Sequence, residues 1–171
     1  MLTERVLVFV LALAAGPALS STAIGVHSNA IGRDGRFAAR NSAYGADIPP
    51  EVDWTAVAGA KSYAIVLDDP DAPGGEPFVH WLVWNIPSSR TRLAEGAPPA
   101  GVAEGQNSHG GSGYWGPHPP SGTHHYHLRV IALDTELPLA PGANRAQFTQ
   151  ASRGHSIASG EIVGLFSPPP H

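Results

Sequence analysis

The sequence predicts a mainly β, loop-rich protein, and three observations lead to this prediction. The chain holds 20 glycines and 17 prolines among 171 residues, spaced too irregularly for collagen or for low-complexity sequence. Three stretches, 62–67, 79–86 and 123–133, have the alternation and composition of β-strands. Only one tract, 144–166, carries apolar residues at helical spacing. These features favour a β fold over a helical bundle.

Composition limits the number of domains and the classes of function. With 171 residues, 42% of them hydrophobic and 14% charged, the chain is long enough for one globular domain and short for two. The formal net charge of −4 argues against nucleic acid or an anionic membrane surface as a general partner. The chain has no cysteine, which excludes a disulfide framework, a thiolate nucleophile and a zinc–thiolate site.

Residues 1–20 are predicted to be a secretory signal peptide. Val6–Ala15 is an unbroken apolar run, roughly half as long as a membrane-spanning helix, and the small residues after it suit cleavage behind Ser20. Glu4 weakens the positive charge expected at the start of such a peptide, so an uncleaved anchor or a buried terminal strand stays open. The prediction is a periplasmic or secreted protein, with a single domain over 21–171 and no stable membrane span.

An acidic turn joins two of the predicted strands. Residues 24–58 are polar and rich in turns, and 58–60 is a tight connection that predicts a hairpin or meander into the strand 62–67. That strand ends in Asp68-Asp69-Pro70-Asp71-Ala72-Pro73, where the prolines stiffen the backbone and hold the carboxylates at the end of the strand. In the next strand, 79–86, strict alternation places one set of side chains on a single face: His80, Leu82, Trp84 and Ile86.

The second half of the chain alternates loops with regular structure. Residues 88–113 form a long glycine-rich segment, which predicts a functional or mobile loop. A stiff aromatic and proline segment, 114–120, leads into the strand 123–133, whose even-numbered side chains, from His124 to Ala132, share one face. The tract 144–166 is predicted to be two short helices with a break at Gly154.

The nine histidines invite a metal hypothesis, because imidazole is a common metal ligand. Three of them crowd into the motif His124-His125-x-His127, but alternation along a strand places His124 on the face opposite to the other two. We therefore predict no structural or catalytic metal site. His118 and His171 are expected to be exposed to solvent.

A hydrolase would need a nucleophile, a base and an orienting carboxylate. Residues of these types are present: Ser108, Ser112, His80, His124 and Asp69. The sequence has no Gly-x-Ser-x-Gly elbow between a strand and a helix and no phosphate-binding glycine loop of the Walker kind. A hydrolase is therefore the least favoured of the functions considered.

An anion pocket is the third interpretation of the same region. Asp69 ends one strand, His80 begins the next, and His124 and Tyr126 point the same way from a third, with Pro120 as a rigid wall. Imidazole and phenol groups donate hydrogen bonds to phosphate-like anions, and a carboxylate can orient a histidine and keep it protonated. From spacing alone, a purely structural pairing of these histidines with the acidic turn is equally acceptable.

Four motifs, in this order, resemble those of the phosphatidylethanolamine-binding protein family: DDPDAP at 68–73, HWLVWNIP at 80–87, GQNSHG at 105–110 and GPHPPSGTHHYHLRVIALD at 116–134. The resemblance covers roughly 23–166, and the tail RGHSIASGEIVGLF is similar to the C-terminal helix of the bacterial, Raf-kinase-inhibitor-like branch. It implies a β-sandwich with a large antiparallel sheet, short flanking helices, and a small anion pocket at one end of that sheet.

The resemblance also implies the residues of this pocket. In the family the pocket takes phosphate, acetate, cacodylate or a phosphoethanolamine head group, and carrying it over gives this set: Asp69, Asp71, His80, Pro120, His124 and Tyr126. Asp71 and Pro73 would shape the turn. Where the family usually has arginine this chain has His125, so a cation that depends on pH replaces a permanent one.

We therefore expect a non-enzymatic protein that binds a small anionic or phosphorylated ligand and needs no cofactor. The alternative is an inhibitor or interaction module that docks a protein partner, such as a protease or kinase, through the pocket and the loop 88–113. The same fold serves both functions, so the fold alone does not choose between them.

Overall fold

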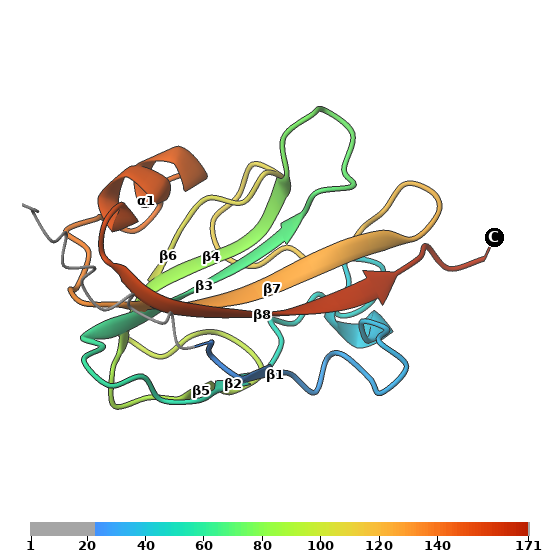
Figure 1. The fold of residues 1–171 in the computed structure, drawn as a ribbon. Coiled ribbons are helices and arrows are strands. Elements are labelled where there is room, and N and C mark those ends of the chain that lie inside the picture. Colours follow the sequence, from blue (N-terminus) through green and yellow to red (C-terminus); the bar gives the residue numbers. More distant parts are fainter. Residues whose placement is uncertain (1–22, 171) are drawn as a thin grey trace, which may run out of the picture.

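Two antiparallel sheets form the protein in the computed structural model, which describes residues 23–170 (Figure 1). The larger sheet has five strands in the order β6 (Ala103–Glu104), β4 (Phe78–Pro87), β3 (Ser62–Asp69), β7 (His124–Leu133) and β8 (Ser156–Phe166). The smaller sheet has three: β1 (Val26–His27), β2 (Val52–Trp54) and β5 (Arg92–Leu93). The helical elements are a 3-10 turn (Ala39–Asn41) and α1 (Arg145–Ser152). The predicted mainly β fold with a large antiparallel sheet is confirmed.

The larger sheet separates two apolar clusters. One lies between the two sheets and includes Tyr63, Ile65 and Leu67 of β3, and the other lies under α1 and includes Ala64 and Val66 of the same strand. Successive side chains of a strand point to opposite faces, so β3 supplies both clusters, and all of its residues are buried. The predicted strands 62–67, 79–86 and 123–133 all form, and the central position of β3 places the acidic turn at the end of the sheet.

The prediction that His80, Leu82, Trp84 and Ile86 share one face of their strand is wrong, because the β3–β4 pairing is irregular at two places. The register shifts between Leu67 and Asp68 and again between Tyr63 and Ile65. Such a shift adds a residue to one strand and reverses the direction of the side chains that follow. As a result, Leu82 and Trp84 belong to the cluster under α1, whereas the rings of His80 and Tyr126 lie 5.2 Å apart on the inter-sheet side.

The helical prediction for 144–166 holds only as far as Ser152. Asn144 caps α1 in a capping box with Gln147, in which each side chain accepts a hydrogen bond from the other residue's backbone N–H. Residues 156–166 form the strand β8 instead, paired with β7 along its length from His124 opposite Phe166 to Leu133 opposite Ser156. The tail 153–166 is therefore not a helix. Its long pairing with β7 satisfies backbone hydrogen bonds and outweighs the helical spacing of its apolar residues.

Two smaller expectations also change. The connection 58–60 links the two sheets rather than forming a hairpin, because β2 pairs with β1 and β5 and not with β3. The segment 88–113 holds the short strands β5 and β6 within its loops.

Between residues 23 and 170, no helix is long and apolar enough to cross a bilayer. The predicted signal peptide, 1–20, lies outside the described residues.

Candidate functional site

A cavity of about 230 Å³ opens at the end of the larger sheet, where the acidic turn meets the starts of β4 and β7. It brings together four of the predicted site residues: Asp69, His80, Pro120 and His124. Aromatic rings complete the wall, from Phe78, Trp115 and His118. Asp71 and Tyr126, the other two predicted residues, do not line it.

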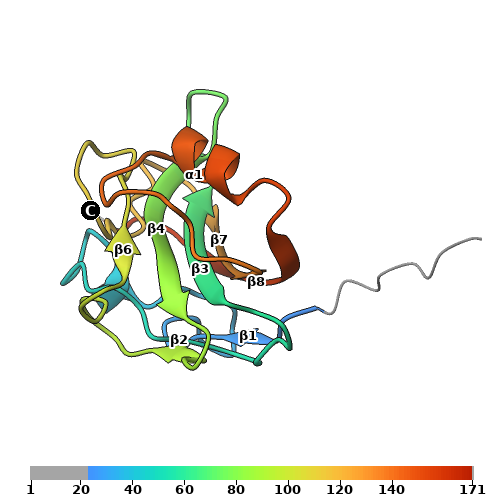
Figure 2. The same ribbon diagram turned by 90° about the vertical axis from the view of Figure 1, so that its left-hand side faces the viewer.

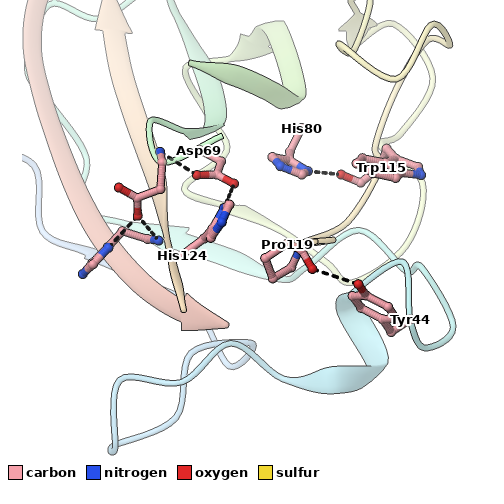
Figure 3. A network of polar contacts seen from close by, with 8 residues as sticks. Tyr44, Asp69, His80, Trp115, Pro119 and His124 are labelled. Carbon is pink, nitrogen blue, oxygen red and sulfur yellow. Dashed lines mark hydrogen bonds and ion pairs between the residues drawn. The ribbon is translucent and has the colours of Figure 1, made fainter. Parts of the chain in front are cut away.

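Asp69 and His124 form a buried pair at the cavity wall (Figure 3). The Nδ1–H of His124 donates to Asp69 Oδ2 over 2.7 Å, and Asp69 Oδ1 accepts a second hydrogen bond, 2.8 Å long, from the backbone N–H of Asp71. The turn thus fixes the carboxylate, and the carboxylate fixes the tautomer and the orientation of the imidazole. Nε2 of His124 is the ring nitrogen left for a ligand.

His80 is held by a backbone carbonyl, where His124 is held by a carboxylate. Its Nδ1–H donates to the carbonyl oxygen of Trp115 over 2.7 Å, and the side chain is almost fully buried. Burial lowers the pKa of His80 to about 4, so this ring is neutral at neutral pH and its Nε2 is a hydrogen-bond acceptor. In the anion pocket expected from the sequence the imidazoles donate to the anion, whereas the free nitrogen of a neutral His80 accepts.

Tyr126 lies behind the cavity wall. Its ring is fully buried, 5.2 Å from the ring of His80 and 6.5 Å from that of His124. Burial, together with the charge of Asp69, raises the pKa of Tyr126, so its hydroxyl stays protonated. That hydroxyl has no hydrogen-bond partner within residues 23–170. The ring of Tyr126 thus packs beside both histidines, on the side away from the cavity.

Asp71 ties the acidic turn to β7. Its Oδ2 accepts hydrogen bonds from both the backbone N–H and the Nδ1–H of His125, at 2.8 and 2.7 Å. These bonds lower the pKa of Asp71. His125 thus reaches the acidic turn from the position where the family has arginine, and Asp71 positions the turn that carries Asp69.

Sequence reasoning missed the aromatic part of the site. The ring of Trp115 lies nearly parallel to that of His80, with centroids 5.5 Å apart, and stacks on His109 at 4.2 Å. The hydroxyl of Tyr44 donates to the Pro119 carbonyl over 2.8 Å (Figure 3). The ring of Tyr44 stacks on the exposed His118. The aromatic and proline segment 114–120 was the available signal. The sequence predicts that this segment is stiff, but only its last residue, Pro120, was assigned to the pocket.

The serines of the hydrolase hypothesis do not join this site. The described residues lining the cavity include no serine, and Ser108 Oγ instead accepts from the backbone N–H of Val79 over 2.9 Å. Within residues 23–170 no group of three or more His, Asp or Glu side chains is placed to hold a metal ion. The arrangement offers hydrogen bonds and aromatic contacts to a small ligand.

Comparisons with known proteins agree on one family. The family described as phosphatidylethanolamine-binding protein matches residues 26–167. A UPF0098 protein of Methanothermobacter thermautotrophicus is 42% identical over 138 residues, which are 77% of this chain and 91% of that protein. A Mycobacterium tuberculosis protein named "Putative lipoprotein LppC" is 42% identical over 127 residues, 73% of this chain and 63% of that protein.

Two solved structures are also similar. CT736 of Chlamydia trachomatis superposes with a TM-score of 0.80 at 30% identity, over 87% of this chain and 100% of that one. YbcL of E. coli, described as a new member of the mammalian PEBP family, gives a TM-score of 0.79 at 31% identity, over 85% of this chain and 99% of that one.

Proposed function

Because the chain belongs to the phosphatidylethanolamine-binding protein family, as its motifs predicted, we propose that it binds a small anionic or phosphorylated ligand in the cavity between Asp69, His80 and His124, without catalysis. The observation that supports this most is the pairing of His124 with Asp69 across the cavity from a neutral His80. In its protonated form His124 could donate Nε2–H to a ligand, whereas neutral His80 can only accept.

This pair of imidazoles favours a particular protonation state of the ligand. Protonated His124 would donate its Nε2–H to a ligand oxygen, with the carboxylate of Asp69 compensating the charge behind it. Neutral His80 needs a hydrogen from the ligand. A phosphate group that keeps one proton offers both an anionic oxygen and a hydroxyl, whereas an ionised carboxylate offers only acceptors. Phosphate or a phosphomonoester head group is therefore the favoured ligand.

The size of the cavity limits how much of the ligand enters. Its volume of about 230 Å³ is below the roughly 300–1,000 Å³ of sites that enclose a whole drug-sized molecule. The cavity would hold a head group, while the remainder of a larger ligand would lie outside over the aromatic rings of Trp115 and His118.

Phosphate should stabilise the protein through His124. A ligand that binds only the folded state adds roughly 2.7 kcal/mol at a hundredfold excess over Kd. His124→Ala should lose most of this gain, and so should His124→Asn, whose amide can still donate to Asp69. The gain in the parent should grow as the pH falls toward about 6, because more of the phosphate then keeps the proton that neutral His80 accepts. Thermal melts with and without phosphate at two pH values measure these effects.

The matched control is His27→Asn, an exposed histidine on β1 beside Asp53, which should keep the full phosphate effect. If His124→Asn gains as much from phosphate as the parent, the anion binds elsewhere and the proposed site is wrong.

We further propose that residues 1–20 direct export. The Val6–Ala15 apolar run motivates this, and similarity to a protein named as a lipoprotein supports it. N-terminal sequencing of protein isolated from fractionated cells should find a chain beginning near Ser21 outside the cytoplasm. Cytoplasmic protein that retains Met1 would contradict the proposal.

A further inference from the structure

A larger cavity, of about 650 Å³, lies between α1 and the loop that joins β3 to β4. Figure 2 shows the helix above the end of β3 and the start of β4, close to that loop. Asp68 and Val79 form part of its lining at the sheet, α1 and the residue after it supply Arg145 and Arg153, and the loop supplies Glu76.

This cavity is on the opposite face of the sheet from His124. Asp68 and Asp69 are consecutive residues of β3, and Asp68 lines the larger cavity whereas Asp69 lines the smaller one. Val79 likewise belongs to the apolar cluster under α1, while His80 contacts Tyr126 on the other side. A ligand in the larger cavity would therefore be separate from one in the anion cavity.

The helical side of the cavity carries a cation that is incompletely paired. Nη1 of Arg145 is buried and has no hydrogen-bond partner within the described chain, although Asp68 Oδ2 lies 3.3 Å away. Asp68 is shared with Arg129, whose Nη1 is 3.8 Å from the same oxygen. Burial lowers the pKa of Arg145, and the neighbouring Arg129 adds to this effect. Nη1 itself is buried beside Asp68, so an incoming oxyanion would meet the other N–H groups of the guanidinium, whose side chain is 36% exposed.

The loop side carries the opposite charge. Glu76 is exposed and forms no ion pair within residues 23–170, and the same holds for Arg153 across the cavity. Ser108 uses its oxygen to accept from Val79, which leaves its hydroxyl hydrogen for a ligand. A second carboxylate in the ligand would be repelled by Glu76, whereas an ammonium group would be attracted.

We propose that this cavity binds a zwitterion of the amino acid or short peptide class, with its carboxylate on Arg145 and its ammonium group toward Glu76. The volume lies within the roughly 300–1,000 Å³ of small-molecule sites. A neighbouring cavity of about 290 Å³ shares Val79, Ser108 and Arg145 and extends the space to Asn144, which favours a short peptide over a single amino acid.

Titration of ¹⁵N-labelled protein with the tripeptide Ala-Ala-Ala tests the proposal. The free peptide should shift the backbone amide signals of Ser108, Thr149 and Glu76 and leave that of His124 in place. Amidation of the peptide's C-terminus should weaken binding by about tenfold or more, because it removes the oxyanion. Acetylation of the N-terminus should weaken binding less, because Glu76 is exposed.

Two variants locate the site independently. Arg145→Gln should weaken binding of the free tripeptide about as much as amidation does. Ala146→Trp, at an exposed position of α1 that lines both cavities, should block binding without disturbing the core. His124→Asn should bind the tripeptide as the parent does. The proposal is overturned if the amidated peptide binds as tightly as the free one, if Ala146→Trp binds normally, or if the tripeptide shifts only the signals around His124.

Discussion

Lowering the pH from 6.5 to about 4 should remove about 3 kcal/mol from the free energy of unfolding through His80 alone. The pKa of His80 is about 4 in the folded protein and 6.5 in the unfolded chain, because burial disfavours the charged ring. The unfolded chain therefore takes up this proton first as the pH falls. The stability that His80 contributes is complete above pH 6.5, is lost between 6.5 and about 4, and changes no further below that.

The matched variant is His80→Asn, which cannot titrate but keeps an amide to donate to the Trp115 carbonyl. It should be less stable than the parent at neutral pH, yet lose about 3 kcal/mol less between pH 6.5 and 4. Urea unfolding at several pH values without phosphate measures the difference. Carboxylates with lowered pKa values, such as those of Asp71 and Glu161, titrate in both proteins, so their contributions cancel in the difference between the two pH profiles. Equal pH dependence in the two proteins would show that His80 is not held neutral.

The core of the site was predictable because its signals are local. Pro70 and Pro73 fix the turn that follows β3, and the Asx bond between Asp69 and Asp71 spans only two residues. His124 begins its strand on the face shared with Tyr126, as alternation predicted. The family resemblance then favoured a ligand pocket over a structural pairing, a choice that spacing alone had left open.

The parts that were missed depend on contacts between distant segments. Nothing near His80 marks the register shift that places Leu82 and Trp84 on the face opposite to His80, because the shift arises from pairing with β3. The position of Trp115 beside His80 depends on how a loop folds back over the sheet. The larger cavity likewise combines α1 with Asp68 and Glu76, which are about 70 residues earlier in the sequence. No sequence motif joins these residues.

In the tail 153–166, pairing with β7 outweighs the helical spacing of the sequence. Substitution of Gly160 tests this, because a strand and a helix predict opposite changes in the free energy of unfolding. A Cβ on this residue would lie 1.9 Å from the carbonyl oxygen of Ile24, because β8 passes close to the backbone there. Backbone would have to move, so Gly160→Ala should lower the free energy of unfolding by about 3 kcal/mol. In an exposed helix the same change would raise it by roughly 0.5–1 kcal/mol.

Ser159→Ala is the control for this prediction. Ser159 is exposed on the other face of β8, and its carbonyl, which accepts from the N–H of Ile24 at 3.1 Å, is unaffected by the substitution. This variant should therefore stay within about 0.5 kcal/mol of the parent. Urea unfolding at neutral pH compares the three proteins. A gain in stability for Gly160→Ala would contradict the strand, because only a segment free of the Ile24 carbonyl has room for the added methyl group.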